Sequence, residues 1–348
     1  MNGSALYRCR FAHHLQVWQP AATLKVSAET QSMASGSKTV IYAAMAGNFL
    51  IAVTKFGAAA MTGSSAMLTE GIHSLVDTGN QVLLLYGLRR AAQPADERFP
   101  FGHGKEVYFW SFVVAILIFA VGAGVSLYEG VARIIAPHPI TDPYINYIVL
   151  ALALVFEGAA WTMAFREFRR AKGKWGYIEA VQRGKDPTLF VVLFEDSAAM
   201  LGLLVALAGI YLSELTGALW LDGAAAVVIG LILASTAVWL AVETKGLLIG
   251  ESANRAVVQD IRDLIRINPR ITHVNEILTM HMGPDFILVN ISVDFADGVP
   301  SQDIEGTIAA LDREIKRQHS EVKRIFIEAE SWRDSSTNLS SETSIEGQ

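Results

Sequence analysis

Apolar residues occur along the chain in six long blocks, separated by short polar stretches. The blocks cover residues 39–61, 65–88, 107–134, 144–165, 188–213 and 219–248. A helix needs about 20 apolar residues to cross the hydrocarbon layer, and only structures with internally closed backbone hydrogen bonding can span it. The pattern predicts an α-helical membrane protein with six transmembrane helices.

After Glu251 the pattern becomes that of a soluble domain. Apolar residues recur at helical spacing in two stretches and alternate with polar ones in three others. In chain order these are a helix at 256–267, strands at 274–282 and 286–295 joined by Gly283-Pro284-Asp285, a helix at 302–319 and a strand at 322–329. We expect a small C-terminal α+β domain of αββαβ order on the cytoplasmic side.

The two ends of the chain have no such pattern. Residues 1–37 lack an acid before Glu29 and carry Arg8 and Arg10, which weakly resembles an organellar transit segment. A disordered tail, or a true start at Met33, is the preferred interpretation. The expected organisation is a tail at 1–37, a cation-transport domain at 38–250, a cytoplasmic dimerisation domain at 251–332 and a disordered tail at 333–348.

Composition agrees with a membrane protein. Hydrophobic residues make up 52% of the 348 positions and charged residues 18%, whereas soluble chains are nearer a quarter charged. The formal net charge of −6 argues against nucleic acid as a partner. Cys9 is the single cysteine, so any metal chemistry must use His, Asp and Glu.

Basic residues predict the orientation. They gather in the loops after the second and fourth spans and after the sixth, whereas the opposite loops hold little beyond Arg133. Because such residues stay on the cytoplasmic side, both termini are expected there. A bacterial inner membrane is the preferred location and an organellar membrane the alternative.

The second span carries the strongest chemical signal. His73 and Asp77 are four residues apart, so they share one helix face, and Glu70 and Asn80 fall close to it. An Asp at mid-helix costs about 2.5–3.5 kcal/mol on insertion scales, so such residues face a partner, a proton path or an ion. His and Asp suit a divalent metal such as zinc. The alternative is a polar contact between helices.

Other spans carry further charged residues. Glu195 and Asp196 are adjacent in the fifth span, and their side chains point about 100° apart on a helix. One of them is expected to coordinate the ion while the other faces a neighbouring helix or accepts protons. Asp196 is favoured for the ion, because a compatible His and Asp pair exists on another helix. For Glu157 and Lys55, a charge pair or helix-end group is about as favoured as a place on the ion path. Asp222, at the start of the sixth span, is expected to be a capping or solvated residue.

Several of these motifs occur together in one known family. Gly71-Ile-His73-Ser-Leu-Val-Asp77, Pro94-Ala-Asp96, Phe101-Gly-His103-Gly-Lys105, Glu195-Asp196 and Leu247-Leu-Ile-Gly-Glu251 resemble the cation diffusion facilitators over residues 38–332. The adjacent acids are similar to the zinc transporter 9 branch. The resemblance implies a homodimer of six-helix subunits that exchanges a divalent metal for protons.

The same resemblance implies a ligand set. The family's tetrahedral site takes two residues from the second helix and two from the fifth, which match His73, Asp77 and Asp196, with Val192 at the remaining position. Valine cannot coordinate a metal, so three ligands remain, as in an open site. Candidates for the fourth are Glu195, Glu70, Glu157 or water.

Two loop features are also implied. Asp96 and His103 match a second family metal site, but Phe99 stands where a His can occur, so this site is expected to be weak or absent. Lys105 matches a lysine that interlocks with an acid below the membrane, and Glu251 is its expected partner.

The C-terminal domain resembles the family's metallochaperone-like dimerisation domain. Positions that bind zinc in some members hold other residues here, namely Asn275, Asn290, Glu305, Glu328 and Glu330. His273 and His281 are expected to be exposed on a strand. We therefore expect this domain chiefly to dimerise.

The expected function is secondary active transport. An unperturbed His titrates near pH 6.5, so the site can hold metal or protons. Zinc is the first candidate; manganese, iron or cobalt export and metal sensing without transport are the alternatives. No His-Glu-x-x-His, Gly-x-Ser-x-Gly or phosphate-cradling motif is present, so an enzyme is not expected. The expected partners are the divalent ion, protons and the lipid bilayer, with no resident cofactor.

Overall fold

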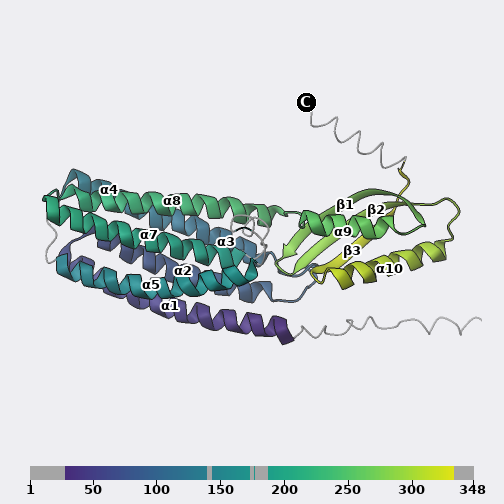
Figure 1. Ribbon diagram of the computed structural model, residues 1–348, viewed down its shortest axis with the longest axis horizontal. Coiled ribbons are helices and arrows are strands. Elements are labelled where there is room, and N and C mark those ends of the chain that lie inside the picture. The colour runs from purple at the N-terminus through teal and green to yellow at the C-terminus, as the bar shows by residue number, and fades with distance from the viewer. Residues whose placement is uncertain (1–27, 139–142, 173–175, 177–186, 333–348) are drawn as a thin grey trace, which may run out of the picture. The chain divides into compact units, whose positions relative to one another are not determined.

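A computed structural model describes residues 28–138, 143–172, 176 and 187–332 of the chain (Figure 1). Six long helical segments match the six predicted spans. They are α1 (Ala28–Thr62), α2 (Ser65–Ala91), the continuous α3 (Glu106–Leu117), η1 (Ile118–Ala123) and α4 (Gly124–Ile135), then α5 (Pro143–Ala171), α7 (Pro187–Thr216) and α8 (Trp220–Ile249). The expected helical fold class is confirmed.

The chain divides into two compact units, Met1–Tyr42 and Ala43–Gln348, and every contact described below lies within the second. Helix α1 begins at Ala28, so residues 28–37 are helical where the sequence predicted a tail. The apolar block marks only the part of a helix suited to lipid, whereas the helix itself extends beyond it. Residues 1–27 and 333–348 of the predicted tails lie outside the described residues.

Four helical segments among the described residues are long and apolar enough to cross a membrane. They are Glu106–Ile135, Tyr144–Arg170, Phe190–Thr216 and Trp220–Ile249. Helix α2 is not among them because it carries a row of polar residues. These residues are buried inside the protein, so α2 is suited to protein neighbours rather than to lipid all round.

The third span contains a π-helical turn at Ile118–Ala123. Such turns insert an extra residue into an α-helix and are frequent at functional sites. Ile118 and Ala123 are both buried in the core. The turn thus changes which residues the third span directs inward.

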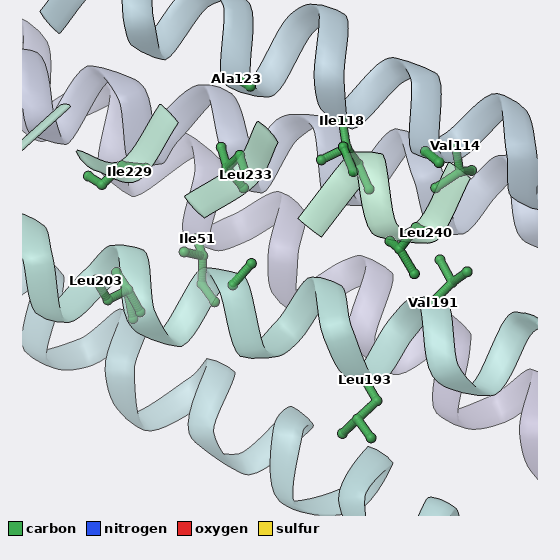
Figure 2. Packing of buried hydrophobic residues seen from close by; sticks show 14 of the residues in the cluster. Ile51, Val114, Ile118, Ala123, Val191, Leu193, Leu203, Ile229, Leu233 and Leu240 are labelled. Carbon is green, nitrogen blue, oxygen red and sulfur yellow. The ribbon is translucent and has the colours of Figure 1, made fainter. Parts of the chain in front are cut away.

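Glycines let α4 and α8 approach closely. A Cβ atom at Gly130 would lie 2.7 Å from Val227 Cγ2, and one at Gly223 would lie 2.8 Å from the Gly130 carbonyl oxygen. Small residues at such contacts allow the backbones to approach, as is usual between membrane helices. Further along the third and sixth spans the core is apolar, with Val114 and Leu240 among its buried side chains (Figure 2).

The C-terminal domain is a three-stranded sheet with two helices. Its elements are α9 (Arg255–Arg266), β1 (Ile271–Gly283), β2 (Phe286–Phe295), α10 (Ser301–Gln318) and β3 (Val322–Ala329). The strand order is β1-β2-β3, with β1 and β2 antiparallel and β2 and β3 parallel. Ile261 of α9, Ile315 of α10 and Val289 of β2 belong to one buried cluster. The predicted αββαβ order is therefore confirmed.

Candidate functional site

Helix α2 carries the predicted site residues on a buried face. Glu70, His73, Asp77 and Asn80 are between 0% and 4% exposed. Their spacing of three or four residues places them on neighbouring turns of the helix. Each polar group in this apolar interior needs a partner or a ligand.

The start of α2 is fixed by Asp222 of α8. The Asp222 carboxylate accepts hydrogen bonds from the Ser64 hydroxyl (2.7 Å) and from the Ser65 backbone N–H and hydroxyl (both 2.8 Å). Arg133 Nε lies 3.7 Å from the same carboxylate. Asp222 is fully buried, so the expectation of a capping residue was right and that of a solvated one was wrong. This contact holds α2 in a defined position for the residues that follow.

His73 and Asp77 face each other with unused ligand atoms. His73 Nδ1 lies 3.4 Å from Asp77 Oδ1. Within the described part of the chain, three atoms of this pair lack a hydrogen-bond partner: His73 Nδ1, His73 Nε2 and Asp77 Oδ1. Two donors at the corners of a tetrahedral zinc site, with bonds of about 2.0–2.1 Å, are about 3.3–3.4 Å apart. The pair therefore has the separation of two ligands of one metal ion.

Helix α7 brings two acids towards this pair. The Asn80 side-chain amide donates a 2.6 Å hydrogen bond to Glu195 Oε1, and the carboxyl groups of Asp77 and Glu195 lie within hydrogen-bonding reach of each other. Asp196 is partly buried and close enough to act electrostatically on Asp77. The structure thus gathers all three carboxyl groups, with Glu195 in the more direct contact.

The predicted ligand set is not preassembled around one point. Among the described residues, no group of three or more His, Cys, Asp and Glu side chains is positioned to hold a metal ion. Val192 packs against the apolar core. The assignment of His73, Asp77, Asp196 and Glu195 as ligands therefore stays a prediction, and binding would require these side chains to converge.

Glu70 and Glu157 are engaged by a lysine. Lys55 Nζ lies 3.0 Å from Glu70 Oε2 and 3.0 Å from Glu157 Oε1, and it donates to the Ser74 hydroxyl oxygen at 2.9 Å. Lys55 is fully buried. This is the charge pair that the sequence left open for Lys55 and Glu157, and it also holds Glu70.

The loop between α2 and α3 contains a second pair of matched residues. His103 Nε2 lies 3.2 Å from Asp96 Oδ2, and its ring packs on Phe99 with ring centroids 4.6 Å apart. The Phe99 backbone N–H donates to Asp96 Oδ1 at 2.6 Å. This hydrogen bond, followed by that from His103, holds the pKa of Asp96 below its usual range. The Phe99 side chain offers no metal ligand. The contact between Asp96 and His103 stabilises the conformation of the loop.

The predicted interlock of Lys105 with Glu251 stays a prediction. Lys105 Nζ lies 3.6 Å from Met280 Sδ, and the Glu251 carbonyl accepts from the His281 backbone N–H at 3.0 Å. His281 is buried, 4% exposed, so the expectation of an exposed residue was wrong, because the face of β1 that carries His281 is covered there. His273 packs on Trp332, with ring centroids 3.8 Å apart.

The residues that sequence reasoning missed are the positioning ones. Ser74 accepts from Lys55, and Ser64 and Ser65 donate to Asp222. Asn80 was placed on the site face from the sequence, but its hydrogen bond to Glu195 was not foreseen. The spacing of Ser74, one turn after Glu70, was the available signal. Hydroxyl and amide residues are too common in membrane helices to single these out without coordinates.

Comparisons with known proteins find a matching family model and several relatives. The model of the cation efflux transmembrane domain matches residues 41–249. The proton-coupled zinc antiporter SLC30A9, mitochondrial, of Xenopus laevis is 34% identical over 76% of this chain and 48% of its own length. Metal tolerance protein C4 of Arabidopsis thaliana is 27% identical over 74% of this chain and 57% of its own. The cation-efflux pump FieF of Escherichia coli is 26% identical over 69% of this chain and 74% of its own length. The chain spans about half the length of the SLC30A9 relatives it matches.

Proposed function

We propose, since the chain belongs to the cation efflux family, the cation diffusion facilitators, and resembles its zinc transporter 9 branch, that it moves a divalent metal ion across a membrane in exchange for protons. Zinc is the first candidate. The relatives are named as a proton-coupled zinc antiporter and a cation-efflux pump, which supports a transporter rather than an enzyme.

The observation that carries this proposal is the geometry of His73 and Asp77. Their facing atoms are 3.4 Å apart, and both ring nitrogens and Asp77 Oδ1 lack hydrogen-bond partners among the described residues. A buried polar atom without a partner costs about 1–3 kcal/mol. Cargo that ligates these atoms removes that cost.

The exchange follows from the chemistry of the ligands. Metal binding requires a neutral imidazole and ionised carboxylates, so the ion and protons compete for His73 and Asp77. Glu195, fixed by Asn80, and Asp196 complete the proposed ligand set from α7. Movement of α1, α2, α5 and α7 against α3–α4 and α8 would expose the site alternately to the two sides. The glycine-lined contact of α4 with α8 supports these two as the stable base.

The acidic side chains of the site also suit manganese or iron as the transported ion. Manganese and iron prefer more oxygen ligands than zinc does, and the carboxyl groups of Glu195 and Asp196 both act on Asp77 here. A metal-resolved uptake series with zinc, manganese, iron, cobalt and nickel separates these ions. Preference for zinc by tenfold or more is the expected result.

We place the protein in an organellar membrane as a homodimer, with both termini on the side of the basic loops. The name of the SLC30A9 relatives includes "mitochondrial", which favours the organellar alternative over the inner membrane preferred from the sequence. Fractionation of cells that express the tagged chain tests the location, and protease protection of the two tagged ends tests the orientation.

The deciding experiment is transport in proteoliposomes. The wild-type chain should accumulate zinc and move protons the opposite way, whereas Asp77→Asn and His73→Ala should abolish both fluxes. Thr162→Ala is the matched control, because the Thr162 hydroxyl donates only within α5, to the Gly158 carbonyl at 2.7 Å. Zinc binding without accumulation by wild type would favour the sensor alternative. Normal transport by Asp77→Asn would refute the site.

A further inference from the structure

A second group of buried charges lies beside the candidate metal site, and the proposed ligand set does not use it. The ammonium of Lys55 in α1 lies midway between two carboxylates, 3.0 Å from Glu70 in α2 and 3.0 Å from Glu157 in α5. Ser74 accepts the third hydrogen bond at 2.9 Å. Lys55 and Glu70 are fully buried and Glu157 is 6% exposed. We call Lys55, Glu70 and Glu157 the lysine cluster.

The charges of the lysine cluster do not cancel. One ammonium compensates one carboxylate, so the cluster with both acids ionised carries a net charge of −1. A solitary charge is costly in the membrane interior. Glu70 Oε1 and Glu157 Oε2 have no hydrogen-bond partner among the described residues. The cluster therefore has both a reason to bind one positive charge and free oxygen atoms on which to bind it.

That positive charge is a proton and not a metal ion. Lys55 already occupies the position between the two carboxylates where a divalent ion would bind both. Its fixed charge repels a further cation, and strongly so at the low dielectric of this interior. A proton, by contrast, forms an O–H bond to one carboxylate oxygen and needs no coordination shell.

The position of the lysine cluster links it to the transport site without merging the two. Glu70 precedes His73 by three residues, and Ser74 follows His73 directly. A Cβ atom at Gly202 of α7 would collide with Glu70 Oε1, so the free oxygen of Glu70 faces α7. The titratable groups that interact electrostatically with the cluster are His73 and Asp77 of α2 and Asp196 of α7, and Glu195 of α7 lies beside Asp77. The cluster thus joins α1, α2 and α5 and faces α7, the four helices proposed to move together.

We propose that the lysine cluster is a proton-only station, which binds one proton on Glu70 or Glu157 in each transport cycle while the metal uses the separate ligand set. The inference rests on the proposed function. An O–H bond forms on the side with the higher proton concentration and breaks on the other, with the proton passing to water. The carboxyl group returns to its ionised form beside Lys55.

The test compares the number of protons moved per zinc ion. Full-length chain in proteoliposomes is held at a set pH difference, and the zinc gradient at which net flux stops gives the ratio. Glu157→Gln leaves the neutral pair Lys55–Glu70, so its ratio should fall by one proton per zinc, with zinc affinity within about twofold of wild type. Glu70→Gln should behave in the same way. Glu214→Gln, an acid of the same helix as Glu195 that accepts from Tyr147, is the matched control and should leave the ratio unchanged.

The outcomes separate the two proposals. Wild type that moves zinc without proton counterflow, or moves none, refutes the proposed function. Coupled wild type with an unchanged ratio in both glutamine variants refutes the proton station alone.

Infrared spectroscopy of wild type covers the case in which the variants do not fold or do not transport. With the metal site saturated by zinc, a protonated carboxyl band that titrates with pH should remain. Its absence would overturn the proton station.

Discussion

Asn80 of α2 donates a 2.6 Å hydrogen bond to Glu195 of α7, and this bond decides which of two adjacent acids faces Asp77. Glu195 is 3% exposed, and its carboxyl group is within hydrogen-bonding reach of Asp77. The family pattern pointed first to Asp196, one residue further. A single amide therefore favours Glu195, the carboxylate that the sequence ranked second.

Asn80→Ala should weaken zinc binding by about tenfold, because partners that orient metal ligands are worth about 10–100-fold in affinity. Isothermal titration of purified protein measures the change. Thr78→Ala, whose hydroxyl donates to the Ser74 carbonyl of the same helix, is the control and should bind as wild type does. Equal affinities for Asn80→Ala and wild type would show that Glu195 needs no such support.

Glu195→Gln should lose zinc affinity by at least as much as Asp196→Asn. Glu195 has the more direct contact with Asp77, whereas Asp196 acts on it electrostatically. Competition with a calibrated zinc dye gives both affinities. Ser235→Ala is the control, since its exposed hydroxyl donates to the Leu231 carbonyl within α8. A larger loss in Asp196→Asn than in Glu195→Gln would restore the ranking of the family pattern.

Asp222→Ala should destabilise the helical domain by about 3 kcal/mol, because it leaves buried donors without an acceptor and Arg133 without its ion pair. The midpoint of unfolding by denaturant in detergent micelles checks this. Glu129→Ala, which removes an acid from the neighbouring α4, should change the midpoint much less. Similar midpoints for Asp222→Ala and wild type would contradict the capping role.

Gly130→Ala should destabilise the α4–α8 contact by about 1–3 kcal/mol, the usual cost of overpacking. The added methyl would lie 2.7 Å from the Val227 backbone nitrogen and 2.8 Å from the Gly223 carbonyl oxygen, and backbone atoms yield poorly. Gly79→Ala is the matched control, since a Cβ there meets no heavy atom within 4 Å. Thermal unfolding should separate the two variants, and equal Tm values would refute the close packing.

Asp96→Asn should reveal a pH-dependent loop contact. The pKa of Asp96 is lowered in the folded protein, so the ionised form stabilises the fold above the unfolded pKa of about 3.9. That stabilisation is lost as the pH falls through the still lower folded pKa. The Tm difference between wild type and Asp96→Asn should thus be constant from about pH 8 to pH 5 and shrink below about pH 4. A difference that grows on acidification would reverse the sign of this argument.

The sequence predicted those features that depend on local pattern. Six apolar blocks became six long helical segments, and the alternation after Glu251 became the αββαβ domain. Spacing alone put His73 and Asp77 on one face of α2. These predictions were correct because hydrophobic periodicity and i, i+4 spacing can be recognised without knowledge of the tertiary fold.

Features that depend on which helices are neighbours could not be predicted in this way. The shared contact of Lys55 with Glu70 and Glu157 joins three helices, and Asp222 meets residues more than 150 positions away. The π turn at Ile118–Ala123 has no distinct local signature, because its residues also form ordinary helix. Burial of His281 likewise depends on neighbours that alternation along β1 does not reveal.

The contact between Lys55 and Glu70 has a consequence for biogenesis. Each charge alone would hinder lateral release of its helix from the translocon into lipid, at about 2.5–3.5 kcal/mol for a central Lys or Asp on insertion scales. Only Gly63 and Ser64 separate α1 from α2, so the two helices emerge almost together and neutralise each other as a hairpin. The first pair of spans should therefore integrate as one obligate unit, and a ribosome-nascent-chain truncation after α1 should leave that helix unanchored.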